Sequence, residues 1–184
     1  MSKKLTGGLV AVAIIALVGV WAASPMLAAQ ALIRAAKAGD ADRIEQLVDF
    51  PSLRQSLKDE LNAELAARMR RDPRLADSGL GGLGMILAPM LVSGAIDATV
   101  TPEVVAHMVT TAEAPDPTAR DPREPGDAAD GDDIHQSWGY RDLNHFAVTL
   151  TDRDHPEQRL ALILERRGLI RWKLAAVDLQ SGDA

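Results

Sequence analysis

The chain has no cysteine, few aromatic residues (3%) and more acidic than basic side chains. The missing thiols exclude disulfides, thiolate nucleophiles and cysteine-ligated zinc. A net charge of -6 offers no basic face of the kind that binds a phosphate backbone, so we expect no nucleic acid partner. With so few rings the core must be aliphatic, and each aromatic residue marks a position of interest.

Signatures of catalysis are also missing. No histidine has the spacing of a metalloprotease motif, no serine lies in a Gly-x-Ser-x-Gly elbow, and the glycines of "GLGGLG" lack a phosphate-loop lysine. We therefore predict no catalytic, cofactor-binding or metal-binding residues and a protein that is not an enzyme. The dispersed histidines are His107, His135, His145 and His155.

A few weaker candidates for chemistry remain. Asp97 lies in an apolar segment, where burial would favour an acid or base, although we favour a role in ending one helix or capping the next. His145 is the only histidine in a predicted strand and so the only one expected to face a pocket. The acidic stretch 127–133 lacks the spacing of a calcium loop and is interpreted as a solvated linker. A basic cluster is interpreted as a solvated helix end rather than a headgroup contact: Arg68, Arg70, Arg71 and Arg74.

A long apolar run opens the chain. Leu5 to Ala23 carries no charge and follows Lys3 and Lys4, a pattern typical of targeting. As a helix this run would span about 28 Å, close to one hydrocarbon core. Cleavage after Ala22 fits the small-residue rule only loosely, and cleavage after Ser24 would leave Pro25 next to the cut, where it makes a poor extended substrate. We therefore predict an uncleaved signal anchor over residues 1–25, with a cleaved, secreted protein as the alternative.

The flanks of this run predict its orientation. Trp21 lies where an interfacial aromatic residue would anchor the helix, and Pro25 is expected to break the chain between a spanning helix and a soluble one. The lysines keep the N-terminus in the cytoplasm. We expect a single-pass protein of the bacterial inner membrane with its soluble domain in the periplasm.

Residues 26–184 are expected to form a single α+β domain that contains a flexible acidic loop at 112–133. Apolar periodicity, an Asp40 cap and a Thr101 cap followed by proline predict its helices. The segment 80–100 is glycine-rich and is interpreted as a buried or broken helix, with a second membrane span as the alternative. The predicted helices cover 26–38, 41–49, about 52–71 and 102–109.

After the loop the apolar period becomes two, which predicts an antiparallel sheet of at least three strands. The first strand includes Tyr140 together with Phe146, Val148 and Leu150. The next two carry leucines at 160–164 and apolar residues at 170–174, joined by a tight turn at Gly168. A bulge at Ala175 or Ala176 is expected because the apolar phase shifts there.

Three stretches resemble a known family: "ASPMLAAQALIRAAKAGDADRIEQLVDFPSLRQSLKDELNAEL", "TPEVV" and "LALILERRGLIRWKLAAVDL" are similar to the bacterial family called domain of unknown function 2939. The family usually has a tyrosine near position 27, where this chain has Leu27, so no aromatic role is implied there. The resemblance implies an N-terminally anchored envelope protein without an assigned reaction. A weaker similarity to the cystatin-like cone of NTF2-like domains implies an apolar pocket.

We therefore expect a membrane-anchored envelope protein that is a non-catalytic interaction or structural module. The alternative is a binder of a small apolar ligand in an NTF2-like pocket. The expected partners are the inner membrane, through the N-terminal helix, and an envelope protein or small apolar ligand. Trp172 is expected to pack between the sheet and the helices, and a face filled by Trp172, Leu162 and Phe146 would count against the ligand hypothesis.

Overall fold

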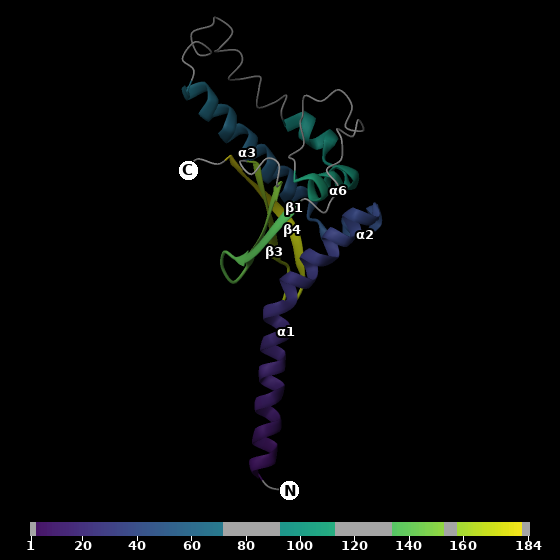
Figure 1. The fold of residues 1–184 in the computed structure, drawn as a ribbon, viewed down its shortest axis with the longest axis vertical. Helices are drawn as coiled ribbons and strands as arrows, with labels where there is room; N and C mark the ends of the chain where they lie inside the picture. The colour runs from purple at the N-terminus through teal and green to yellow at the C-terminus, as the bar shows by residue number, and fades with distance from the viewer. Residues whose placement is uncertain (1–2, 72–92, 113–133, 153–157, 182–184) are drawn as a thin grey trace, which may run out of the picture.

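The computed structural model describes residues 3–71, 93–112, 134–152 and 158–181, and it places helices first and one sheet last (Figure 1). The helices are α1 (Lys3–Ala38), α2 (Ala41–Leu47), α3 (Phe50–Arg71) and α6 (Pro102–Thr111), and residues 93–99 are also helical. The strands are β1 (Ile134–Tyr140), β2 (His145–Asp152), β3 (Gln158–Arg166) and β4 (Trp172–Ser181). The expected α+β class with a C-terminal antiparallel sheet is confirmed.

Helix α1 runs without interruption through Pro25, so the break predicted there is wrong. A proline has no N–H to donate to the carbonyl four residues earlier, which here belongs to Trp21. The hydroxyl of Ser24 donates to that carbonyl instead, at 2.7 Å. Because the carbonyl keeps a partner, the helix continues to Ala38. Gly39 follows with a φ of +65°, a conformation that glycine adopts readily and that terminates the helix.

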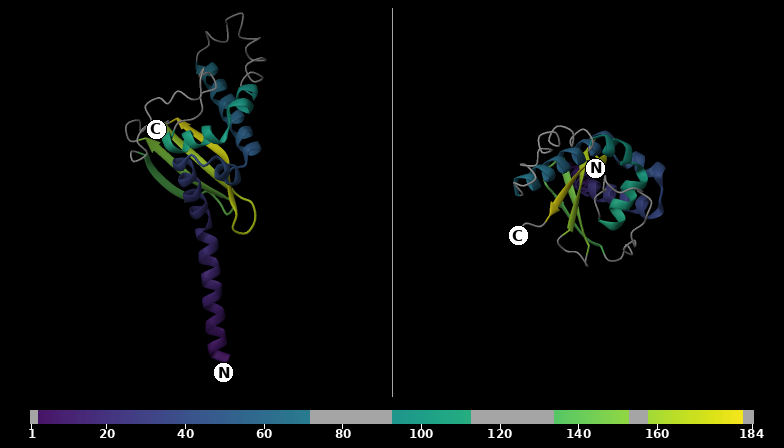
Figure 2. Two further views of the ribbon diagram at one scale, coloured as in Figure 1. Left: turned by 90° about the vertical axis from the view of Figure 1, so that its right-hand side faces the viewer. Right: turned by 90° about the horizontal axis from the view of Figure 1, so that it is seen from above.

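The two halves of α1 have different surroundings. The side chains of residues 12–20 are exposed, and this part of the helix projects from the rest of the protein as an isolated rod (Figures 1 and 2). From Ser24 onward one side of the helix is buried, through Ala29 and Leu32 among others. We call residues 3–20 the stem and the remaining described residues the body.

Helices α2 and α3 are joined by a short link that is tied to the sheet. Asp40 caps α2 as predicted, accepting a hydrogen bond from the N–H of Arg43. Helix α3 begins at Phe50, two residues earlier than predicted. Between the two helices the N–H of Asp49 donates to the carbonyl of Leu174 at 2.8 Å. This bond fixes the link against β4.

The sheet is an antiparallel meander in the order β1-β2-β3-β4. The predicted first strand is two strands in the structure. Tyr140 ends β1, whereas Phe146 lies in β2. The carboxylate of Asp142 accepts hydrogen bonds from the N–H groups of Asn144 and His145, which closes a turn over residues 141–144. Alternation of apolar residues alone does not reveal such a turn, because the pattern continues on both sides of it.

The predicted bulge in β4 is confirmed at Ala175. Leu164 pairs with Leu174 and Ile163 pairs with Ala176, which leaves Ala175 between the two pairs. The extra residue lets Leu174 and Val177, three positions apart, both join the core.

The core lies between this sheet face and the helices α1, α2, α3 and α6. Phe146, Leu162 and Trp172 are nearly completely buried in it. Thr101 caps α6 as predicted, and Ala112, expected in the loop, is a buried residue that closes this helix with a φ of 60°. The segments 80–92 and 113–133 lie outside the described residues.

Candidate functional site

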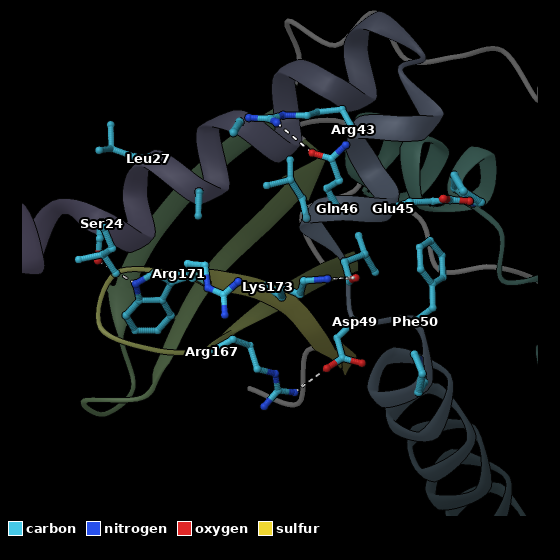
Figure 3. A pocket seen from close by; sticks show the side chains of 18 of the residues that line it. Ser24, Leu27, Arg43, Glu45, Gln46, Asp49, Phe50, Arg167, Arg171 and Lys173 are labelled. Carbon is cyan, nitrogen blue, oxygen red and sulfur yellow. Dashed lines mark hydrogen bonds and ion pairs between the residues drawn. The ribbon is translucent and has the colours of Figure 1, made fainter.

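A groove of about 1030 Å³ opens beside the upper part of α1 (Figure 3). Its walls come from α1, from α2, from the link between α2 and α3, from the start of α3, and from the β3–β4 hairpin. Leu27, Leu47 and Phe50 contribute apolar surface, while Trp172 and Lys173 are the first two residues of β4. The groove therefore joins elements from both ends of the chain.

Positive charge dominates the lining of this groove, in contrast to the net charge of the whole chain. The charged lining residues are Arg43, Arg54, Arg167, Arg171 and Lys173 against Glu45 and Asp49. Such a lining suits a carboxylate or phosphate group, because guanidinium groups bind both in bidentate geometry.

Several of these cations already hold the walls together. Arg167 binds the carboxylate of Asp49 at 2.8 Å and that of Glu165 at 2.9 Å. Lys173 donates to the carbonyl of Val48 at 3.3 Å. Among the described residues, no hydrogen bond or ion pair holds the exposed guanidinium of Arg171. Arg171 is therefore the lining cation best placed to meet a ligand.

The ion pair of Asp49 and Arg167 affects the pKa of the Asp49 carboxyl. Partial burial alone would raise the pKa of the Asp49 carboxyl. The backbone N–H of Ser52 and the guanidinium of Arg167 outweigh this effect and hold the pKa below its ordinary value of 3.8. The carboxylate thus stays charged at neutral pH and keeps Arg167 in place.

A second cluster joins the part of α1 directly after the stem to the sheet. The guanidinium of Arg166 lies between the rings of Trp21 and Trp172, 4.4 Å from each centroid. The indole N–H of Trp172 donates to the hydroxyl of Ser24 at 2.8 Å. The hydroxyl of Tyr140 donates to the carbonyl of Ala22 at 2.8 Å. We call these six residues the junction.

Arg166 also connects the two hairpin turns nearest the stem. Its Nε and Nη2 donate to the carbonyl of Leu143 at 3.0 and 2.7 Å, and its Nη1 donates to the carbonyl of Leu169 at 2.9 Å. One side chain therefore fixes the stem, the β1–β2 turn and the β3–β4 turn relative to one another.

The residues singled out from the sequence do not come together. Asp97 forms a surface ion pair with Lys58 at 2.7 Å, and its side chain is 54% exposed. It lies in the last turn of the helical segment 93–99, so the prediction that it caps the next helix is wrong. The cap belongs to Thr101. His145 lies 2.7 Å from a carboxylate oxygen of Asp142 and 3.7 Å from one of Glu165. Asp97 and His145 thus have separate partners.

The other candidates are exposed or lie outside what the structure describes. His107 and His135 are exposed, on α6 and β1. His155, the acidic stretch 127–133 and Arg74 fall outside the described residues, as do the side chains of the other arginines in the basic cluster. Within the described ranges, no group of three or more acidic or histidine side chains is arranged to hold a metal ion.

Sequence reasoning missed the arginines of the junction and the groove. "RRGL" was interpreted only as a tight turn, although Arg166 and Arg167 hold two different clusters. The partners of the junction are far apart along the chain; Ser24 and Trp172 are separated by 148 positions. Local patterns carry no signal for such contacts, and only the low aromatic content marked Trp21 and Trp172.

Comparison with known proteins identifies a family for the first half of the chain. The model of a family described as "Protein of unknown function (DUF2939)" matches residues 14–108. The match begins inside the stem and ends within α6, so it includes the link and most of the groove's helices but not the sheet. No curated protein and no solved structure matches the chain. The similarity to a cystatin-like cone therefore stays a prediction.

Proposed function

Since this chain belongs to the DUF2939 family of proteins of unknown function, we propose its role from its own structure: a membrane-anchored interaction module. In this proposal the stem crosses the bacterial inner membrane once and the body lies on the periplasmic side. The body acts by binding a partner in the groove rather than by catalysis.

The observation that carries the proposal is the exposed apolar stem. Its large side chains face outward with no protein around them, among them Val12, Ile15 and Leu17. The helix is long and apolar enough to cross a membrane. Such a surface is costly in water, whereas hydrocarbon solvates it and a helix satisfies its own backbone hydrogen bonds there.

The junction supports an uncleaved stem. A leader peptidase needs an extended substrate, but the backbone around Ala22 and Ser24 is helical and Ser24 is buried. Cleavage at either position would also separate Trp21 from Arg166. We infer that the leader stays attached as a signal anchor, with the domain boundary proposed at residue 25 lying inside α1.

The groove supports a binding role. Its cationic lining and apolar walls suit an acidic segment of an envelope protein. The alternative, a small apolar ligand held by the concave sheet face, has less support. Phe146, Leu162 and Trp172 fill that face with their own side chains.

Extraction of the full-length chain from membranes tests the anchor. We expect the wild-type protein to resist alkaline carbonate and to have its full-length mass by mass spectrometry. Replacing Ile14 and Leu17 together by lysine should release it, since each charge at mid-membrane costs about 3 kcal/mol. Met26→Lys, in the same helix but in the body, is the matched control and should stay in the membrane fraction.

Two results would contradict the proposal. One is a shortened wild-type product, and the other is a full-length wild-type protein in the soluble fraction. Orientation is tested with Ala63→Cys, an exposed position in α3: an impermeant maleimide should label it in intact spheroplasts. Because the chain has no other cysteine, this label reports one site.

A further inference from the structure

The two hairpin turns at the stem end of the sheet carry exposed apolar side chains. Leu143 in the β1–β2 turn is 70% exposed, and Leu169 and Ile170 in the β3–β4 turn are 82% and 57% exposed. Turn tips in water are usually built from polar residues and glycine. We call Leu143, Leu169 and Ile170 the apolar tips.

The tips lie at the level where the stem leaves the body. Both hairpins point toward the N-terminal end of α1 (Figures 1 and 2). The contacts of Arg166 also place both turns next to the foot of the body, since its guanidinium lies over the ring of Trp21 and donates to the carbonyls of Leu143 and Leu169. Seen from above, the N-terminus lies within the outline of the body, so the body stands over the stem (Figure 2).

The tips are held rather than loose. The three hydrogen bonds of Arg166 link the two turns to each other. The carboxylate of Asp142 closes the β1–β2 turn further. Its hydrogen bonds with the N–H of Asn144 and with His145 lower the pKa of this carboxyl, because they favour its charged form. A fixed tip loses little conformational freedom on binding, which favours contact with a surface.

The charge of the same turns is positive. Residues 141–144 and 166–171 contain four arginines and one acidic residue, Asp142. Ion pairs and the junction already engage three of these arginines, and Arg171 is the one for which the described residues provide no ion pair. Anionic headgroups attract such an arginine near the membrane surface. Apolar tips framed by arginines and continuous with an apolar stem match the boundary between headgroups and acyl chains.

We propose that the apolar tips dock on the lipid bilayer at the foot of the stem. Leu143, Leu169 and Ile170 enter the headgroup boundary, Arg171 meets a lipid phosphate, and Trp21 lies at the same interfacial depth. This inference rests on the proposed anchor, because the stem brings the tips to the surface. Docking gives the body a second point of attachment and thus a defined orientation.

Depth-dependent quenching on the full chain tests the docking. Single-cysteine variants Leu169→Cys, Leu17→Cys and Ala63→Cys, each carrying an environment-sensitive fluorophore, are reconstituted into vesicles of phosphatidylethanolamine and phosphatidylglycerol. Lipids brominated near the headgroup should quench the Leu169 label at least twofold more than the Ala63 label. Lipids brominated deep in the chain should quench the Leu17 label.

The outcomes separate the two proposals. Equal quenching of the Leu169 and Ala63 labels, with the Leu17 label quenched, would overturn docking and leave the anchor in place. An unquenched Leu17 label would overturn the anchor as well. If the Leu169 label were shielded from aqueous iodide without any quenching by lipid, the tips would be covered by a second copy of the chain, which also overturns docking.

Charge is tested in the same system. With the label at Leu143→Cys, Arg171→Glu should reduce quenching at least twofold in vesicles containing phosphatidylglycerol and leave it unchanged in pure phosphatidylcholine. Leu169→Asp with Ile170→Asp should reduce it in both. Because these positions are exposed, the variants should stay folded, and circular dichroism checks this. Equal quenching of the parent and the aspartate variant would contradict tip insertion.

Discussion

At the scale of single residues, Ser24 has the most demanding position in the protein. Its hydroxyl donates to the carbonyl that Pro25 leaves without a partner and accepts the indole N–H of Trp172. From the sequence alone, Ser24 is a poor cleavage site, and Pro25 after it is expected to break the helix. A hydroxyl with two partners explains why the helix continues instead.

Removing this hydroxyl should destabilise the body. In Ser24→Ala the buried N–H of Trp172 has no acceptor, which typically costs about 1–3 kcal/mol. Chemical unfolding of the full chain in detergent, followed by tryptophan fluorescence, measures the loss. Ser137→Ala, at an exposed position in β1, is the control and should change stability by less than about 0.5 kcal/mol. Equal effects of the two substitutions would remove Ser24 from the junction.

Asp49 is the residue whose charge the groove depends on. Its pKa in the folded protein lies below 3.8, so the carboxylate stabilises the fold at pH values above its unfolded pKa. This contribution is lost as the pH falls through the lower, folded pKa.

The variant Asp49→Asn should therefore be less stable than the wild type at pH 7, and the difference should shrink below pH 4. Urea unfolding at pH 7, 4 and 3 measures both effects. The control is Asp59→Asn, at an exposed position of α3. A difference between wild type and Asp49→Asn that stayed constant down to pH 3 would mean that the ion pair with Arg167 adds nothing.

At the scale of elements, α1 departs most from the sequence-based expectation. Its two parts were predicted correctly as helices, and only the joint between them was wrong. A proline in a helical pattern usually marks a boundary, but here the neighbouring serine satisfies the freed carbonyl. The turn between β1 and β2, which was not predicted, is a similar case. Asp142 closes it with side-chain hydrogen bonds that apolar alternation does not reveal.

Replacing Pro25 tests this view of α1. In Pro25→Ala the backbone N–H of residue 25 can bond the Trp21 carbonyl, and the usual cost of a proline within a helix is removed. We expect a gain of about 1–2 kcal/mol, reduced from about 3 by the lost packing of the ring. Pro51→Ala, in the first turn of α3 where proline is tolerated, is the matched control. A loss of stability in Pro25→Ala would mean that the proline itself is required.

At the scale of the whole molecule, the sequence predicted the parts better than their meeting points. The order of helices and sheet, the two caps and the bulge at Ala175 follow from local spacing and are confirmed. The groove and the junction depend on Arg166, Arg167 and Trp172 meeting residues far away in the chain. The residues that form these sites lie in ordinary turns and strands, where no sequence motif marks them.

The whole-molecule arrangement concentrates the notable features at one end. The apolar tips, the junction and the Arg171 side of the groove all lie close to the stem. A partner that enters the groove would therefore be bound near the membrane surface, if the stem crosses the bilayer as proposed.

Because α1 is unbroken through Pro25, the rotation of the stem about its own axis fixes the direction in which the sheet faces. Inserting a single residue in the stem would lift the body by about 1.5 Å and turn it by about 100° against whatever grips the N-terminal turns. A bilayer of different thickness would tilt the rod and carry the sheet with it. The groove would then face a new direction without any change in its own residues.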